Sequence, residues 1–282
     1  MNRASWYGWE RDENGRTEHV QTWEQVRAHE RAEKHYTEAS FKFQELYSKC
    51  SEKEMIGAQE ILARKIDLTN RFKLSDIKLV AGVDLIYMKD KDGNERALCD
   101  IEVIDINTKE IANNSRGVSI NPAPYHPGFL AFREFPAVLS AYSSLWIKPD
   151  IFMFDGNGYL HDRHAGLATH ASIMLDIPAI GVAKTYSKID GVDYEMPENE
   201  VGAYTDIVIR GEVYGRVLRT RRDVKPIFVS CGNWIDLDTA TEITMRMVTP
   251  ESRLPLPTRM ADICVRETRR ILLEAHERDV AN

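Results

Sequence analysis

Two very short and wholly apolar segments, IFMF at 151–154 and AIGVA at 179–183, restrict the fold of this chain more than any other feature. Short apolar runs of this kind are typical of strands that are buried on both faces of a sheet. Helix-forming patterns at 129–147 and 164–175 precede them, so helices and strands alternate with short links. This alternation predicts parallel strands that are joined by right-handed crossovers.

The flanking segments extend the predicted sheet. Residues 78–87, 97–106 and 111–120 have the pattern of an antiparallel meander, with a turn at Asp92-Gly93 between the first two strands. Further strands are expected at 207–218 and 226–230, and further helices at 51–66, 236–248 and 259–278. The predicted fold class is therefore α/β, with one mixed sheet (an antiparallel meander plus parallel strands) that is flanked by helices.

The first fifty residues have a different pattern. From 21 to 49 charged residues recur every two or three positions among few apolar ones, which is typical of a mostly exposed helix, in one piece or two. Ser51 and Glu54 then have the form of a capping box, which marks the start of the next helix. We expect a charged helical N-terminal extension over 1–50 and one α/β domain over 51–282.

The overall charge is acidic, but basic residues are clustered. The chain has 37 Lys and Arg residues against 44 Asp and Glu residues, and the net charge of −7 argues against non-specific coating of nucleic acid. A local basic surface is nevertheless expected, because some clustered cations suit phosphate contacts, although a charge run is more often a solvated face. Its candidates are Arg216, Arg219, Arg221, Arg222, Lys225, Arg259, Arg266, Arg269 and Arg270.

No segment marks the chain for a membrane or for secretion. No apolar run approaches the roughly 20 residues that a membrane-spanning helix needs, and the N-terminus lacks the apolar core of a signal peptide. Four cysteines, Cys50, Cys99, Cys231 and Cys264, lie far apart without a CxxC pair, which favours free thiols in a reducing compartment. We expect a cytoplasmic protein without a membrane partner. The sequence leaves the oligomeric state open, and a monomer is our expectation.

Three carboxylates occupy positions where the predicted structure makes them unusual. Asp84 interrupts an apolar strand, where a charge is costly unless it is paired or binds a metal. Asp155 follows a parallel strand, at the edge where α/β sheets bind ligands, and Glu134 lies in the helix after a Pro-rich loop. Each also has a purely structural interpretation: a backbone hydrogen bond for Asp84, a turn for Asp155 and an exposed ion pair with Arg133 for Glu134.

Taken together, the three carboxylates predict metal-assisted phosphoryl chemistry. Carboxylates that converge on one point raise each other's pKa, and a cation is needed to keep them ionised near neutral pH. Hard oxygen ligands suit Mg²⁺ or Mn²⁺, with water and phosphate oxygens completing the coordination. Such an ion can lower the pKa of an attacking water and neutralise a leaving oxygen.

Five sequence blocks carry a resemblance to a known family. They are AGVDLIY (81–87), PYHPGFLAFRE (124–134), DGNGYLHDRHAGLATH (155–170), IGVAK (180–184) and RLPLPTRMAD (253–262). These blocks closely resemble the endonuclease V family, which are inosine-directed nucleases with a ribonuclease H-like fold. They occur in family order between about 52 and 262, which covers roughly three quarters of the chain.

The resemblance implies roles for five residues of a catalytic site. Asp84 and Asp155 match the metal-binding aspartates of the family, with Glu134 as the helix carboxylate beside them. Lys184 matches a lysine that contacts the scissile phosphate or stabilises its developing charge. Asp262 matches a position where the family has Asp or His, although an acidic residue in the first turn of a helix is favoured by the dipole in any case. The implied cofactor is Mg²⁺, with Mn²⁺ as a substitute.

The resemblance also implies a substrate-binding site. Tyr125, next to Pro124 and before Pro127, matches a wedge that enters a base step when a nucleotide is turned out of the helix. The implied pocket and its surroundings comprise Pro127, Gly128, Leu130, Gly156, Gly158, His161 and Gly181. The chain departs from the family pattern at His126 (usually Ile), at Asn157 (often His) and at Asn233-Trp234 (usually within GHR).

Three histidines allow a zinc-site alternative. His161, His164 and His170 have a spacing that fits one helix, but no cysteine or further cluster supports a zinc site. The resemblance instead favours His161 as a site residue and the other two as helix residues.

The implied function is that of a DNA repair endonuclease. The resemblance implies recognition of deoxyinosine and hydrolysis of the second phosphodiester bond on its 3′ side with Mg²⁺, leaving 3′-hydroxyl and 5′-phosphate ends. One alternative is an endoribonuclease that acts on inosine in RNA with the same site, because the sequence does not show whether a 2′-hydroxyl is accepted. A second is a catalytically inactive nucleic-acid-binding protein, against which the retention of Asp84, Glu134, Asp155 and Lys184 argues.

Overall fold

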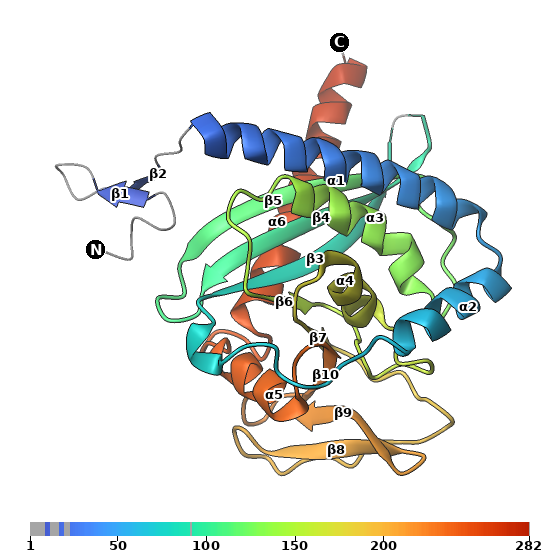
Figure 1. The fold of residues 1–282 in the computed structure, drawn as a ribbon, viewed down its shortest axis with the longest axis vertical. Helices are drawn as coiled ribbons and strands as arrows, with labels where there is room; N and C mark the ends of the chain where they lie inside the picture. Colours follow the sequence, from blue (N-terminus) through green and yellow to red (C-terminus); the bar gives the residue numbers. More distant parts are fainter. Residues whose placement is uncertain (1–8, 12–16, 20–22, 91, 282) are drawn as a thin grey trace.

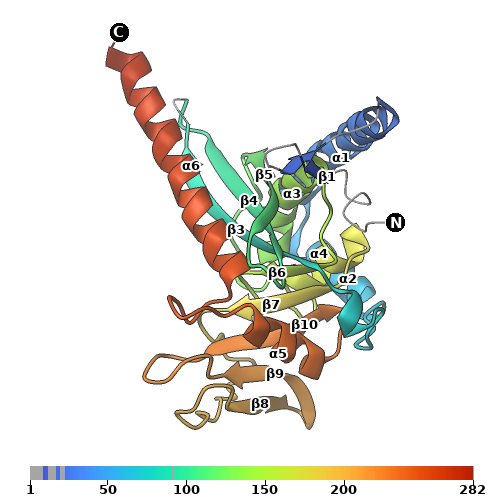
Figure 2. The same cartoon turned by 90° about the vertical axis from the view of Figure 1, so that its left-hand side faces the viewer.

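The fold is built on one large sheet with helices on both faces (Figures 1 and 2). The computed structural model describes residues 9–11, 17–19, 23–90 and 92–281. The sheet has eight strands in the order β5-β4-β3-β6-β7-β10-β9-β8. The strands are β3 (Leu79–Lys89), β4 (Glu95–Asp105), β5 (Ile111–Ile120), β6 (Ile151–Phe154), β7 (Ala179–Ala183), β8 (Tyr204–Ile209), β9 (Glu212–Leu218) and β10 (Ile227–Asn233). A separate pair, β1 (Trp9–Arg11) and β2 (Thr17–His19), is antiparallel.

The sheet is mixed, as the sequence predicted. Strands β3, β4 and β5 form the antiparallel meander, while β3, β6 and β7 are parallel neighbours. The strand region expected at 207–218 is present, but a tight turn that the sequence did not predict divides it into the hairpin β8–β9. Arg210 and Gly211 in this turn both have positive φ, of 54° and 80°, which is the backbone of a two-residue hairpin connection.

The helices divide between the two faces of the sheet. They are α1 (Trp23–Lys49), α2 (Glu52–Ala63), α3 (Leu130–Ser143), α4 (Leu167–Leu175), α5 (Leu237–Arg246) and α6 (Leu256–Ala281), and a 3₁₀ turn spans Leu74–Asp76. Helices α3 and α4 cover one face, with α1 packed outside α3, whereas α5 and α6 cover the other (Figure 2). None of the helices in the described part of the chain is long and apolar enough to cross a bilayer.

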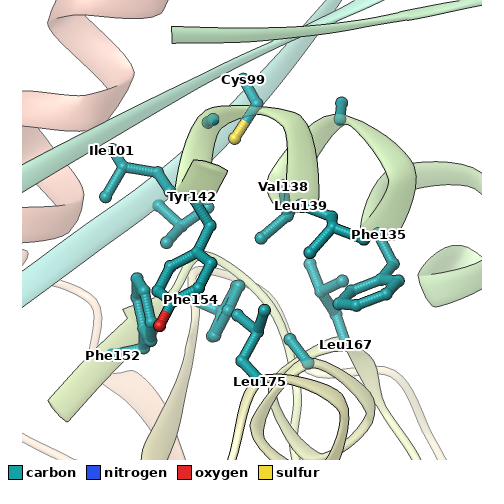
Figure 3. Close-up of a cluster of buried hydrophobic side chains, with 14 of the residues drawn as sticks. Cys99, Ile101, Phe135, Val138, Leu139, Tyr142, Phe152, Phe154, Leu167 and Leu175 are labelled. Carbon is teal, nitrogen blue, oxygen red and sulfur yellow. The ribbon is translucent and has the colours of Figure 1, made fainter. Parts of the chain in front are cut away.

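The main hydrophobic core lies between the sheet and the α3–α4 layer (Figure 3). Aromatic side chains contribute to it: Phe135 from α3 and Phe152 and Phe154 from β6 are fully buried. A second core on the opposite face joins the sheet to α5 and α6. Strand β6 is therefore covered on both faces, which explains why all four of its side chains are apolar.

Helix α1 is one continuous helix whose C-terminal part packs on α3. The Tyr47 side chain is buried, and its hydroxyl lies 2.9 Å from Nε2 of His170 in α4. The Ser40 hydroxyl donates to the carbonyl of Pro136 at 2.7 Å. Helix α2 then begins with the predicted capping box, in which Ser51 and Glu54 bond each other's backbone N–H groups.

Helix α6 lies very close to β3. It begins at Leu256 rather than 259. Pro257 is tolerated in the first turn because the N–H groups there have no partner within the helix, and proline lacks that group. A Cβ atom added to Gly82 of β3 would overlap the backbone of Pro257 and Thr258, so only glycine allows this approach. The close packing brings the start of α6 over the strand that carries Asp84.

Candidate active site

Three candidate residues lie at one edge of the sheet because their strands are parallel neighbours. Asp84 lies in β3, Asp155 directly follows β6 and Lys184 directly follows β7. The backbone N–H of Asp155 donates to the carbonyl of Val83 at 3.1 Å, which fixes Asp155 beside Asp84. This edge is the position that the sequence predicted for a ligand site.

Lys184 and α6 complete the cluster. The ammonium group of Lys184 forms an ion pair with Asp155, and it lies 3.5 Å from Oδ1 of Asp262. Arg266, one turn further along α6, holds the same Asp262 oxygen at 3.0 Å. Because α6 begins at Leu256, Asp262 lies beyond the first turn, so the helix dipole does not explain its presence.

Burial and repulsion perturb the titration of Asp84. Burial raises the pKa of this carboxyl to about 8, with a further contribution from the negative charge of Asp155, while Lys184 opposes the shift. Asp84 also shares a hydrogen bond with Asp262. Burial alone would raise the pKa of Asp262, but this bond and the nearby Lys184 and Arg266 lower it. These opposite shifts favour the neutral form of Asp84 and the ionised form of Asp262.

Glu134 approaches the cluster from the other face of the sheet. It lies on α3 and is buried, and the Tyr87 hydroxyl donates to its Oε1 at 2.9 Å. Burial raises its pKa to about 7; the Tyr87 bond lowers the pKa, and the negative charge of Asp155 raises it. The exposed pair with Arg133 is not formed, because Arg133 instead binds Glu95 at 2.7 Å.

The donor set fits a hard divalent cation. Among the residues that the structure describes, no three acidic, histidine or cysteine side chains are placed as a closed metal site. Mg²⁺ commonly binds to only one or two carboxylates and completes its octahedron with waters and substrate phosphates. Asp84 and Asp155, whose mutual repulsion raises the pKa of Asp84, supply such a pair. The residues present therefore fit Mg²⁺ or Mn²⁺.

The glycines expected to line a pocket have a close-packing role in the structure. A Cβ atom on Gly158 would overlap the carbonyl of Cys231 in β10, and one on Gly181 would overlap the turn formed by Gly156, Asn157 and Gly158. The turn after β6 thus rests directly on β7 and β10. Gly156 has more room, because a Cβ atom added there would meet nothing nearer than the Leu167 side chain, at 3.8 Å.

The Pro-rich loop presents Tyr125 to solvent. Tyr125 has 63% of its surface exposed, and His126 and Pro127 beside it are also exposed. Gly128 has a φ of +81°, which favours glycine, and Leu130 begins α3 half-buried. The carbonyl of Gly128 lies 2.9 Å from Nε2 of His161, so the loop contacts the turn after β6.

Two residues that contact the candidate site residues were not predicted from the sequence. Tyr87 binds Glu134, and Gln59 of α2, which is fully buried, joins the Pro-rich loop to the turn after β6. The Gln59 amide donates to the carbonyl of Gly128 at 2.8 Å, and its oxygen accepts from Nε of Arg163 at 2.6 Å. The available signal was a polar residue on the apolar face of a helix.

The three histidines have separate partners. His161 contacts Gly128, whereas His170 is fully buried beside Tyr47, and burial lowers its pKa to about 4. His164 stacks on Tyr159 with ring centroids 4.0 Å apart. The expectation that His164 is a helix residue is wrong, because α4 begins only at Leu167 and His164 has a φ of +56°, whereas His170 lies in α4 as expected.

Two of the residues that were predicted to form a basic surface are buried instead. Arg216 and Arg219 are buried, since each is only 8% exposed. Arg216 binds Asp206, its partner across the β8–β9 hairpin, at 2.8 Å and also Asp238 at 2.7 Å. Further candidates form ion pairs on the surface: Arg222 with Glu200, Arg259 with Glu251, Arg266 with Asp262, and Arg270 with Glu267 and Glu274.

The departures at 233–234 have structural roles. Asn233 is buried, and its Oδ1 accepts the backbone N–H of Asp67 at 2.7 Å. Trp234 has a φ of +55° and stacks under the guanidinium of Arg71, 3.6 Å from the ring centroid. Both residues therefore hold the segment between α2 and β3 against the end of β10.

Comparisons with known proteins agree with this architecture. The family model described as Endonuclease V matches residues 60–263. Endonuclease V of Bacillus thuringiensis is 53% identical over 221 residues, which cover 78% of this chain and 94% of that protein. The crystal structure of endonuclease V from Bacillus subtilis superposes with a TM-score of 0.78 at 49% identity, covering 82% of this chain and 97% of that one.

A third match contains nucleic acid. Endonuclease V of Ciona intestinalis, in complex with a DNA that contains an inosine followed by a ribo-adenosine, has a TM-score of 0.69 at 28% identity and covers 78% of this chain and 98% of its own. Together, the mixed sheet and these matches define a nuclease of ribonuclease H-like fold. The chain belongs to the endonuclease V family, whose nucleases are typically metal-dependent.

Proposed function

We propose that this enzyme recognises deoxyinosine in DNA and hydrolyses the second phosphodiester bond on its 3′ side, leaving 3′-hydroxyl and 5′-phosphate ends. The observation that carries the proposal is the cluster of Asp84, Asp155, Asp262 and Lys184 at the edge of the sheet. Binding of an inosine-containing DNA by the Ciona relative supports the choice of substrate.

Asp84 and Asp155 are the proposed ligands of a Mg²⁺ ion, with Glu134 as the third carboxylate; Mn²⁺ is the expected substitute. When bound, the ion supplies charge neutralisation at the phosphate and lowers the pKa of an attacking water. Metal binding requires that Asp84 lose the proton it shares with Asp262. The site therefore binds the metal more tightly as the pH rises toward 8.

The other polar groups of the cluster act on the substrate and on protons. The Lys184 ammonium, whose pKa the neighbouring carboxylates raise against the effect of burial, stays cationic and contacts the scissile phosphate. Before the metal binds, the Glu134 carboxyl, with a pKa of about 7, exchanges its proton readily near neutral pH. Asp262 holds Lys184 in place from α6.

Tyr125 is the proposed wedge, because it is exposed at the tip of a Pro-flanked loop. The turn after β6, with Gly156 and Gly158, and Gly128 opposite it form the proposed walls for the extruded base. His161 shapes this pocket through its contact with the Gly128 carbonyl. Hypoxanthine lacks the exocyclic amine of guanine, so a small pocket with backbone groups discriminates in its favour.

The proposed catalytic unit spans 51–282, and residues 1–50 form an extension to it. The family match at 60–263 lies within the proposed unit.

A direct test of the proposed function is cleavage of matched single-inosine DNA and RNA strands in Mg²⁺. The proposal predicts efficient cutting of the DNA at the second bond; preferential cutting of the RNA would favour an endoribonuclease, and no cutting of either would favour a binding protein.

Asp155→Ala tests the metal assignment within the same assay. The variant should lose Mg²⁺-dependent cleavage but still bind inosine-containing DNA in Ca²⁺, because the wedge and base pocket are untouched. Asp92→Ala is the matched control, since Asp92 is exposed in the β3–β4 turn. Undiminished cleavage by Asp155→Ala would refute the assignment.

A further inference from the structure

A cleft of about 670 Å³ opens beside Lys184, on the side of the active site away from Asp84. One wall is the chain that follows β7, over 184–199, and the other is the connection from β9 to β10, over 219–228. The lining includes Lys184, Lys188, Tyr194, Met196, Lys225 and Phe228. The cleft is thus continuous with the cluster that holds the reacting phosphate in the proposed function.

Hydrogen bonds join the two walls of the cleft. The Arg219 guanidinium, which is 8% exposed, donates to the carbonyls of Pro197 and Glu198 in one wall and of Val224 in the other. Asn199 and Asp223 bond each other reciprocally across the walls, at 2.7 and 2.9 Å. The cleft is therefore preformed, and a ligand need not order it on binding.

The lining combines aromatic and cationic side chains. Tyr186 stacks on the buried Phe228 with ring centroids 5.5 Å apart, and Tyr194 packs edge-on against both. Tyr186 and Tyr194 are half-buried, so these two rings supply the aromatic surface of the lining. Met196 at the rim is 55% exposed, and Lys225 is also exposed. Apolar surface for bases beside cations for phosphates is the chemistry that binds single-stranded nucleic acid.

The two acidic residues of the lining, Asp193 and Asp223, are outnumbered by its four cationic residues, Lys184, Lys188, Arg219 and Lys225. Asp193 forms an ion pair with Lys188 at 2.6 Å, and Asp223 accepts from the Asn199 amide. Lys225 is exposed at the outer wall, and Lys184, which is paired with Asp155 and Asp262, lies where the cleft meets the cluster. A strand that leaves the cluster would therefore follow cations along its backbone.

We propose that this cleft binds the segment of the cleaved strand that lies 3′ to the scissile phosphate. The inference rests on the proposed function, in which the cut falls 3′ to the recognised base. The loop that carries Tyr125 contacts the turn after β6 through Gly128, whereas the cleft lies on the far side of Lys184, between the chain after β7 and the β9–β10 connection. Strand β7 lies between β6 and β10 in the sheet (Figure 1). A strand that runs from the wedge past Asp84, Asp155 and Lys184 enters the cleft next.

Substrate truncation combined with two cleft variants tests this proposal. The substrates are an inosine-containing DNA that is long on both sides, one that ends a single nucleotide beyond the scissile bond, and one that is shortened equally on the 5′ side. We expect Lys225→Gln to lower kcat/KM on the long substrate about fivefold and to reduce its log–log salt slope by about 0.7, since one phosphate contact is lost. Met196→Glu, which adds a negative charge, should lower kcat/KM about tenfold.

The diagnostic result is that the kcat/KM defect of each variant depends on the presence of the 3′ segment of the substrate. On the 3′-truncated DNA both variants should match the wild type within about twofold, whereas 5′ truncation should leave their defects unchanged. Lys42→Gln and Leu46→Glu on α1 are matched controls, because Lys42 is exposed and Leu46 is 56% exposed. Equal defects on all substrates, or coupling to the 5′ truncation, would overturn the proposal. A wild-type enzyme that cleaves no inosine substrate would instead refute the proposed function.

Discussion

Replacing Glu134 with glutamine tests the energetic cost of the buried carboxylate. Burial raises the pKa of Glu134 from 4.5 to about 7, so the folded state binds its proton more tightly than the unfolded chain does. The free energy of unfolding therefore falls as the pH rises from about 4.5 to about 7, and the loss is complete above pH 7. At about 1.4 kcal/mol per pKa unit, the cost is below about 1 kcal/mol near pH 5 and about 3 kcal/mol near pH 8.

The glutamine variant has no charge to bury, so its stability relative to the wild type should depend on pH. We expect Glu134→Gln to gain about 2.5 kcal/mol against the wild type between about pH 5 and about pH 8. Urea unfolding in EDTA at both pH values measures this difference, and any pH-independent cost of the amide cancels. Glu60→Gln on the exposed side of α2 is the control. An equal stability difference at the two pH values would refute the reasoning.

Three further variants address the contacts around the site. Tyr87→Phe removes the hydrogen bond that stabilises ionised Glu134, so the acidic limb of the kcat/KM profile should move up by about one pH unit; an unchanged limb would contradict the role of this bond. Gln59→Leu leaves the Gly128 carbonyl without its amide partner and should cost about 2 kcal/mol in urea unfolding, with a larger loss of selectivity than Tyr125→Phe. Tyr125→Ala should reduce discrimination for inosine over normal bases while leaving Tm unchanged, because the side chain is exposed; retained selectivity would exclude the wedge.

The sequence was sufficient to predict a mixed sheet and the sheet edge at which Asp84 and Asp155 lie. Asp84 and Asp155 are recognisable because each follows or interrupts an apolar strand, and parallel neighbours end at the same edge. Strand periodicity is a local property, so it survives without knowledge of the tertiary structure. The hairpin at 210–211 was missed because an Arg-Gly turn is a weak signal beside the apolar pattern of its strands.

Contacts between distant segments could not be predicted. Arg216 looked like a surface cation because nothing in its neighbourhood shows that β8 places Asp206 opposite it. The bond between Asp84 and Asp262 likewise depends on how closely α6 packs on β3. Gln59 was hidden for the same reason: its three hydrogen-bond partners come from Gly128, Arg163 and Ala165, far away in the chain.

The glycine at position 82 has a consequence for engineering this enzyme. The helix that carries Asp262 rests on the bare backbone of β3 at this point, two residues before Asp84. Any side chain at 82 would act as a spacer that lifts the start of α6 away from the strand and widens the gap between the two aspartates. A mutant library that aims to alter the metal preference of the enzyme can include alanine at position 82, because it changes the distance between Asp84 and Asp262. A library that aims to alter base selectivity should retain Gly82.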